Sequence, residues 1–304
     1  MKKFKKQISF LLCIIILLSS NCIYASAEDN SNEIERAKNV LLQSGWTIEE
    51  INDFLTEEAL LEYKDAQPAV VSEKKYFKVS EDAVQEVTKE ECEEAVAEIK
   101  ENNMVSPASY IPGGGVDSDE VVTTDGYMEY YVSAYNVGEN GEYILSARYE
   151  WLISPFFTDI DVFGLGHDTN LTQLSDHDVY YVYKVDGMFT TGLTTSYFTD
   201  EYTVPDGINI DDGGTVVKQD LSTHAVTTTS YGTTFFNHRG FIQYRVRLNN
   251  FNVNTVAVYA EYLHQQHILS VSPSISYPAG GSIGVSSESK FKRMSPNPYL
   301  SFEV

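Results

Sequence analysis

Residues 143–152 read YILSARYEWL, and this stretch decides the fold. Large apolar and aromatic side chains alternate along it with polar ones. Successive side chains of a β-strand lie on opposite faces of a sheet, so a period of two predicts a strand with one face toward a core. We therefore expect Tyr149 and Trp151 in the core and Arg148 and Glu150 on the outer face.

The same alternation recurs on both sides of this stretch. It is present in residues 127–135, 241–248 and 255–263, and residues 179–185 form a further aromatic-rich segment. Asp-Gly, Asn-Gly and Arg-Gly pairs, which are typical of turns, separate these runs. Several short strands without intervening helical patterns predict a mainly β protein whose residues 120–304 form an antiparallel β-sandwich, with a closed barrel as the alternative. The turn pairs include Asp186-Gly187 and Arg239-Gly240.

Residues 28–104 carry helical patterns instead. Apolar residues recur at helical spacing over 33–44, and Gly45 is placed to end that helix. The chain is therefore predicted to begin its mature part with a small helical module over residues 28–104 that includes one short strand over residues 75–80, followed by a Pro- and Gly-rich linker over residues 105–119. Capping residues precede three further helices: Thr47 with Glu50, Thr56, and Thr88 with Glu91.

The first residues read as an export signal. A Lys-rich start precedes an apolar run over residues 10–18, and Ala25-Ser26-Ala27 supplies the small residues of a cleavage site. We expect residues 1–27 to be removed after Ala27 and the product to be secreted into the extracellular space. A lipoprotein anchored at Cys22 is the alternative, although Cys22 follows Asn21 and lacks the usual lead-in. Cys92 is then the remaining cysteine, so no intramolecular disulfide can form. We expect it as a buried small residue on a helix rather than as a nucleophile.

Charge excludes some classes of partner. Without its leader the chain has 17 basic and 44 acidic side chains, a formal net charge of −27. Such a charge repels phosphate backbones and anionic lipid headgroups, which disfavours nucleic acid as a partner. No alternating segment has the continuous apolar band that a membrane-spanning strand needs, so the sequence predicts no membrane insertion and disfavours a pore former.

Six short stretches carry a resemblance to known proteins. They are residues 44–47, 124–128, 145–152, 237–241, 282–286 and 289–291. Together they resemble a group of uncharacterised small secreted proteins of bacilli, some of them prophage-borne. The resemblance implies secretion and a two-part architecture, and no activity or catalytic residue carries over from it.

Two His-Asp pairs lie ten residues apart and are the candidate metal ligands. Imidazoles and carboxylates of His167, Asp168, His177 and Asp178 could bind a divalent metal. This hypothesis is the basis of an alternative function, a secreted metal-assisted hydrolase. The spacing matches no closed zinc pattern, and the aspartates are also ordinary turn formers.

A Gly-rich segment offers a second candidate for metal binding. Residues 206–214 place oxygen-bearing side chains in a predicted turn, and oxygen is the ligand that calcium prefers. Calcium is therefore the candidate cofactor, although the order is not that of an EF-hand loop and a plain hairpin turn explains it as well. The candidate ligands are Asp206, Asn209, Asp211 and Asp212.

One predicted strand face is rich in tyrosine. Tyr127, Tyr131 and Tyr135 share this face, with polar side chains between them. Flat aromatic rings can stack on sugar rings, so this face is a candidate binding surface. The alternative is that another layer of the protein covers it.

Basic side chains are few after residue 110, and most fall in residues 239–247 and 290–293. Arg245 and Arg247 are two apart on one predicted strand, so they share a face and can bind a carboxylate or phosphate. An anionic partner such as a cell-wall polymer would suit them. Internal pairing with acidic side chains is the alternative.

These observations predict a secreted, soluble binding or interaction protein of the extracellular space or cell envelope. No Gly-x-Ser-x-Gly motif occurs, and no pair of carboxylates can be singled out among 44 acidic residues. We therefore assign no catalytic residue and expect a protein without enzymatic activity, with the metal-assisted hydrolase as the alternative.

Overall fold

A computed structural model describes residues 31–80, 83–104, 125–138, 140–154, 160–175, 179–191, 194–221, 231–265, 275–276, 282–286 and 291–304. The predicted signal peptide, its cleavage site and the predicted linker over residues 105–119 lie outside them. The chain divides into two compact units, Met1–Pro68 and Ala69–Val304.

The first unit is helical. Residues 31–43 form a helix, and Gly45 ends it with a φ of 90°, a conformation that favours glycine. Helix α2 (Ile48–Phe54) begins at the predicted capping box of Thr47 and Glu50. Helix α3 (Glu57–Leu61) begins at Thr56, as expected. The buried residues of this unit include Leu41, Trp46, Ile51, Phe54, Leu60 and Tyr63.

Residues 69–104 belong to the second unit, although their sequence pattern grouped them with the helical module. Strand β1 (Val71–Val79) pairs along its length with β3 (Gly126–Asn136), and β2 (Val84–Val87) pairs with β1. Helix α4 (Lys89–Met104) follows, with Glu91 bound to Thr88 at its start. A local pattern cannot reveal a strand partner so far along the chain. Within the described residues, no helix combines the length and hydropathy needed to cross a bilayer.

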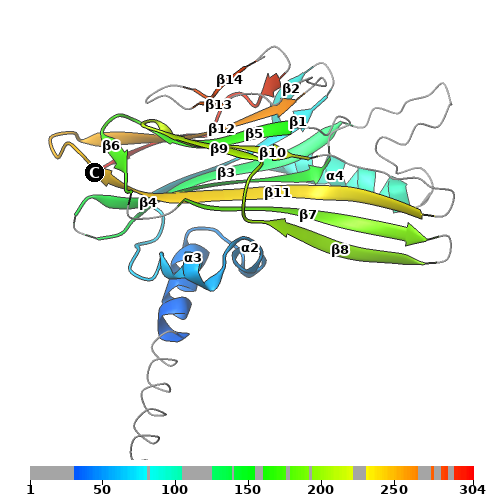
Figure 1. Ribbon diagram of the computed structural model, residues 1–304, viewed down its shortest axis with the longest axis horizontal. Coiled ribbons are helices and arrows are strands. Elements are labelled where there is room, and N and C mark those ends of the chain that lie inside the picture. The colour runs from blue at the N-terminus through cyan, green and yellow to red at the C-terminus, as the bar shows by residue number, and fades with distance from the viewer. Residues whose placement is uncertain are drawn as a thin grey trace, which may run out of the picture. The chain divides into compact units, whose positions relative to one another are not determined.

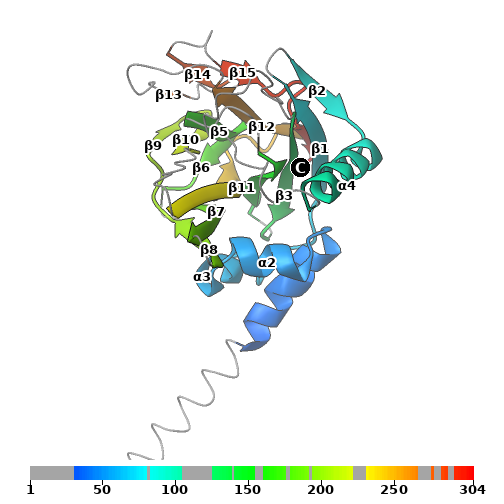
Figure 2. The same cartoon turned by 90° about the vertical axis from the view of Figure 1, so that its right-hand side faces the viewer.

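Two antiparallel sheets form the rest of the second unit, which confirms the predicted β-sandwich (Figure 1). Among the described residues the larger sheet has the order β2-β1-β3-β4-β11-β7-β8, with β6 beside β11. The smaller sheet has the order β15-β12-β5-β10-β9, with β16 beside β12. The sheets end in β8 and β9, which lie on the same side of the sandwich (Figure 2).

The remaining strands have the following bounds. In the larger sheet they are β4 (Glu142–Ile153), β6 (Leu171–Gln173), β7 (Tyr180–Thr191), β8 (Thr195–Tyr202) and β11 (Tyr231–Leu248). In the smaller sheet they are β5 (Ile160–His167), β9 (Gly207–Asp211), β10 (Gly214–Asp220), β12 (Thr255–Gln265), β15 (Phe291–Arg293) and β16 (Tyr299–Glu303). A short hairpin pairs β13 (Ile275–Ser276) with β14 (Gly284–Val285).

The core lies between the sheets and contains the predicted face of β4. Tyr149 and Trp151 are fully buried there, as expected. The Trp151 Nε1 donates a hydrogen bond of 2.9 Å to the hydroxyl of Tyr262 on the opposite sheet. That hydroxyl donates to Asp161, whose carboxylate is also 2.9 Å from the Nδ1 of His264. These polar groups are buried but mutually paired, as buried polar groups must be.

Part of the other face of β4, including Ser146 and Arg148, is also buried, which the alternation did not predict. Arg148 points away from the core as expected, yet only 2% of its surface is exposed. Its guanidinium lies 4.7 Å from the centre of the Tyr131 ring, a cation–π contact. A period of two reveals which residues share a face, but not whether a further layer covers that face.

Candidate functional site

The structure buries the tyrosines proposed as a sugar-stacking surface. Tyr127, Tyr131 and Tyr135 are each less than a tenth exposed. Between them, the hydroxyl of Ser133 lies 2.8 Å from that of Ser146. This face is therefore packed, and its rings present no open surface to a ligand.

The arginines proposed for an anionic partner face an internal acid. The Nε of Arg247 donates to Glu142 over 3.0 Å, and Arg245 lies 3.9 Å from the same carboxylate. The two basic segments also separate in space, because Arg239 pairs with Asp186 on the larger sheet and Arg293 pairs with Glu261 on the smaller one. They do not combine into one basic patch.

The proposed His-Asp metal site is only partly described. The Nδ1 of His167 lies 3.0 Å from the carbonyl oxygen of Asp168, and burial lowers the pKa of this imidazole. The Asp168 carboxylate accepts bonds of 2.8 Å from the backbone amides of Asn170 and Ala257, so it acts as a turn former. His177 and Asp178 lie outside the described residues. Within the described chain, no three His, Cys, Asp or Glu side chains gather as metal ligands would.

The proposed calcium ligands are spread along a strand rather than gathered in a loop. Asp206 and Asp212 flank β9, and an extended chain of that length spans about 20 Å. Asp206 accepts a bond of 2.7 Å from the backbone amide of Asp220, and Asn209 donates to Asp211 over 3.0 Å. The segment is a β-hairpin, the simpler of the two interpretations, because β9 pairs antiparallel with β10.

A three-stranded extension of the larger sheet is the most unusual surface of the described chain. We call it the distal sheet: residues 187–191 of β7, 195–199 of β8 and 231–236 of β11. In Figure 1 these strand ends extend beyond the labelled strands of the smaller sheet. None of these residues is charged, in a chain whose residues are 21% charged.

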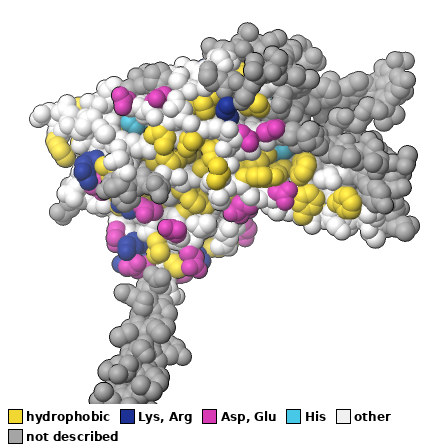
Figure 3. All heavy atoms as spheres, viewed as in Figure 1, with side chains coloured by type: hydrophobic (Ala, Val, Ile, Leu, Met, Phe, Trp, Pro, Cys, Tyr) yellow, Lys and Arg dark blue, Asp and Glu magenta, His cyan; other side chains and the backbone are white. Residues whose placement is uncertain are grey.

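Six of the sixteen residues of the distal sheet are aromatic. Tyr197 is 73% exposed and Phe189 is 38% exposed. Figure 3 shows hydrophobic side chains at the surface on this side of the molecule. Phe198 lies over Gly187, where an added Cβ would come within 2.2 Å of its ring, and its ring centre is 5.9 Å from that of Phe235. A glycine at 187 is therefore required by the close approach of this ring.

A β-bulge in β11 marks the base of the distal sheet. The pairing with β7 shifts between Phe236 and Arg239, so that two residues of β11 face one of β7. The first of them, Asn237, has a φ of 55°, a left-handed conformation that is costly for a residue with a side chain. The second, His238, is buried and stacks on Tyr183, whose hydroxyl lies 2.6 Å from its Nδ1.

The bulge holds Asp186 in a network of hydrogen bonds. Its carboxylate accepts bonds of 2.7 Å from both the Thr199 hydroxyl and the Asn237 side chain, and lies 3.1 Å from the Arg239 guanidinium. Burial alone would disfavour the ionised form, but these donors and the positive charge of Arg239 outweigh it, and the pKa of Asp186 is lowered. Asp186 is therefore a charged and fixed acceptor at neutral pH.

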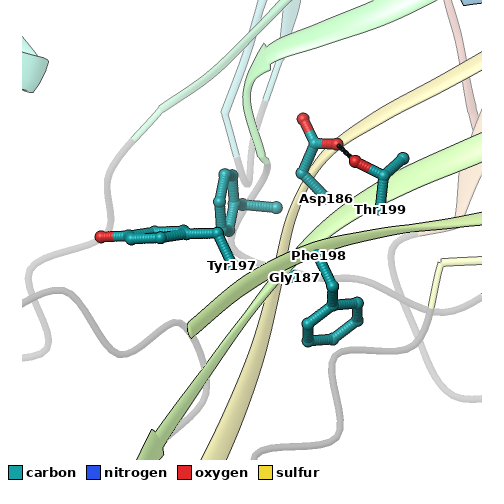
Figure 4. Close-up of a pocket in the computed structure, with 6 residues that line it drawn as sticks. Asp186, Gly187, Tyr197, Phe198 and Thr199 are labelled. Carbon is teal, nitrogen blue, oxygen red and sulfur yellow. Dashed lines mark hydrogen bonds between the residues drawn. The ribbon is translucent and has the colours of Figure 1, made fainter. Parts of the chain in front are cut away.

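Asp186 is one of the residues that line an open pocket of about 370 Å³. We call it the Asp186 pocket; its lining includes Tyr197, Thr199 and Phe236, which the strand register places on the same face as Asp186. Figure 4 shows Asp186 and Thr199 on one side of the strands and Phe198 on the other. Strands β7, β8 and β11 thus contribute one polar centre, Asp186 with Thr199, and the aromatic residues Tyr197 and Phe236 to the same pocket.

Sequence reasoning missed this region because two of its signals had ordinary explanations. Asp186-Gly187 and Arg239-Gly240 suggested turns, yet β7 and β11 run straight through them. A positive signal was nevertheless present: residues 187–199 and 221–236 contain no Asp, Glu, Lys or Arg in an otherwise highly charged chain.

Comparisons with known proteins give no family. No family model matches the chain, and no curated protein matches it. Among solved structures, similarity extends to one described as a pore forming protein, with 9% identity over 59% of this chain and 85% of that one, at a TM-score of 0.22. It also extends to the NetB toxin of Clostridium perfringens in its membrane-inserted form, with 10% identity over 59% of this chain and 89% of that one, at a TM-score of 0.20. Such scores establish neither a shared fold nor a shared activity.

Proposed function

We propose that this protein is an extracellular binding protein that attaches to the surface of uncharged membranes through its distal sheet. The observation that carries the proposal is the combination of exposed aromatic rings with the absence of charged residues from the three strand segments of the distal sheet. Aromatic side chains favour the boundary between water and lipid, where a ring can leave water while polar groups stay wet. Thr191, Thr195, Thr199 and Thr233 of the distal sheet supply such polar groups.

Charge decides which membrane fits. Without its leader the chain has a formal net charge of −27, so an anionic lipid surface repels it as a whole. A zwitterionic surface such as phosphatidylcholine does not. The distal sheet adds no local charge to be stripped of water on contact. We therefore assign phosphatidylcholine-type surfaces as the partner, with the protein lying on the bilayer rather than across it.

Sedimentation with lipid vesicles tests the proposal. The secreted protein should sediment with phosphatidylcholine vesicles, and less so as phosphatidylglycerol is added. Burying a large aromatic side chain is worth about 1.5–3 kcal/mol. Tyr197→Ser, which removes the most exposed ring of the distal sheet, should therefore weaken binding by about tenfold or more.

Two substitutions elsewhere provide matched controls. Phe251 and Tyr299 are also strongly exposed aromatic residues, and both lie outside the distal sheet. Phe251→Ser and Tyr299→Ser should leave vesicle binding unchanged. The proposal fails if the native protein ignores phosphatidylcholine vesicles, or if the distal and control substitutions weaken binding equally.

A further inference from the structure

We infer that the Asp186 pocket binds a neutral sugar ring through its carboxylate and its flanking aromatic side chains. This goes beyond the proposed function, because sugar binding at the pocket needs no bilayer. The pocket volume of about 370 Å³ lies within the range of small-molecule sites.

The charges around the pocket favour an uncharged ligand. Asp186 would repel an anion, and Arg239, 3.1 Å from the same carboxylate, compensates the charge that would attract a cation. A carboxylate still has more acceptor sites than the three donors that hold it. A neutral ligand whose hydroxyl groups donate hydrogen bonds fits the remaining acceptor sites of the Asp186 carboxylate.

The aromatic lining narrows the ligand to a ring with a flat apolar side. Tyr197 is largely exposed beside the carboxylate, and Phe236 lines the same pocket from β11. Sugar rings present C–H groups on one side and hydroxyl groups at the edge. The C–H side can stack on an aromatic ring while the hydroxyl groups donate hydrogen bonds to Asp186. An apolar ligand would leave the charged carboxylate without a new partner.

The pocket is also built in advance of any ligand. Asn237 keeps its left-handed backbone conformation while its side chain donates to Asp186, and Arg239 donates to the Asn237 carbonyl oxygen over 3.0 Å. Such a preformed acceptor lowers the entropy cost of binding. Strained backbone that is held by surrounding contacts is typical of binding sites.

Binding of the full secreted chain to an array of neutral mono- and oligosaccharides tests the inference. We expect the protein to bind at least one sugar, and calorimetry with the corresponding methyl glycoside gives its affinity. Tyr197→Ala should weaken that affinity by about tenfold or more, because it removes the stacking ring from an exposed position. Thr199→Val, which removes a hydroxyl next to Asp186, should also weaken it. Tyr299→Ala, at another exposed tyrosine, should not.

Vesicles identify the source of the sugar. Stronger binding to phosphatidylcholine vesicles that contain glucosylceramide or galactosylceramide, reversed by the free methyl glycoside, supports the inference with a glycolipid as the source. Sugar binding without this gain supports it with a soluble or wall glycan as the source. The inference is overturned if no neutral sugar of the array binds, or if binding survives both pocket substitutions in variants that keep the native melting temperature. Plain phosphatidylcholine vesicles test membrane attachment separately, so either idea can fail alone.

Discussion

Replacement of His238 by Gln should remove a defined part of the protein's sensitivity to acid. Burial, and then the positive charge of the neighbouring Arg239, lower the pKa of His238 to about 3 in the folded protein. An unfolded chain binds a proton at histidine with a pKa of about 6.5. Between these two values the unfolded state binds more protons than the native state. Stability is therefore complete above about pH 6.5 and falls as the pH drops toward 3.

The size of the effect follows from the two pKa values. At pH 4.5 the solution is about two pH units below the pKa of histidine in the unfolded state, whereas His238 in the native state is still neutral. Protonation therefore stabilises the unfolded state by about 2.7 kcal/mol relative to the native state. Urea denaturation at pH 7.5 and 4.5 measures the change in the free energy of unfolding. The wild-type protein should lose about 2.7 kcal/mol more than His238→Gln between the two values, because all other titrating groups are common to both.

Tyr183→Phe provides the control. It removes the hydroxyl that lies 2.6 Å from His238 but keeps the imidazole, so its dependence on pH should follow the wild type even if its stability at pH 7.5 is lower. If His238→Gln loses as much stability as the wild type on acidification, His238 takes up a proton freely in the folded protein. The assignment of a buried, neutral imidazole to His238 at the bulge would then be wrong.

Two further predictions concern the core. Trp151→Ala should lower the free energy of unfolding by about 3–5 kcal/mol and Glu150→Ala by less than about 1 kcal/mol; equal losses in urea denaturation would contradict the assignment of faces on β4. Burial raises the pKa of the Cys92 thiol to about 11, so a thiol reagent should label Cys92 only in the unfolded protein; rapid labelling under native conditions would show an accessible thiolate instead.

The sequence was sufficient for features that depend on near neighbours. The alternation over residues 143–152 identified Tyr149 and Trp151 as core residues, and Thr47 and Thr56 marked helix starts. Both signals act within a few residues of chain, and the physical rule behind each is local.

Features that depend on distant neighbours were not predictable in this way. Nothing near Arg148 in the sequence indicates that its face is covered, because the Tyr131 ring beneath its guanidinium comes from another strand. The Asp186 pocket combines three strands whose lining residues lie up to fifty positions apart, and its geometry depends on a bulge near Asn237. An Asp-Gly pair inside a strand looks like a turn until the partner strands are known.

The position of β11 has a consequence for the order in which the chain can fold. β11 lies between β4 and β7, and it joins the block β2-β1-β3-β4 to the hairpin β7-β8. Because β11 comes late in the chain, the larger sheet cannot close until nearly the whole protein is available. A product cut before residue 231 would keep two blocks, each with a long unpaired strand edge, and such edges promote aggregation. The two blocks of the larger sheet can thus be joined only once the chain is available through residue 248, and until then each block keeps an open edge.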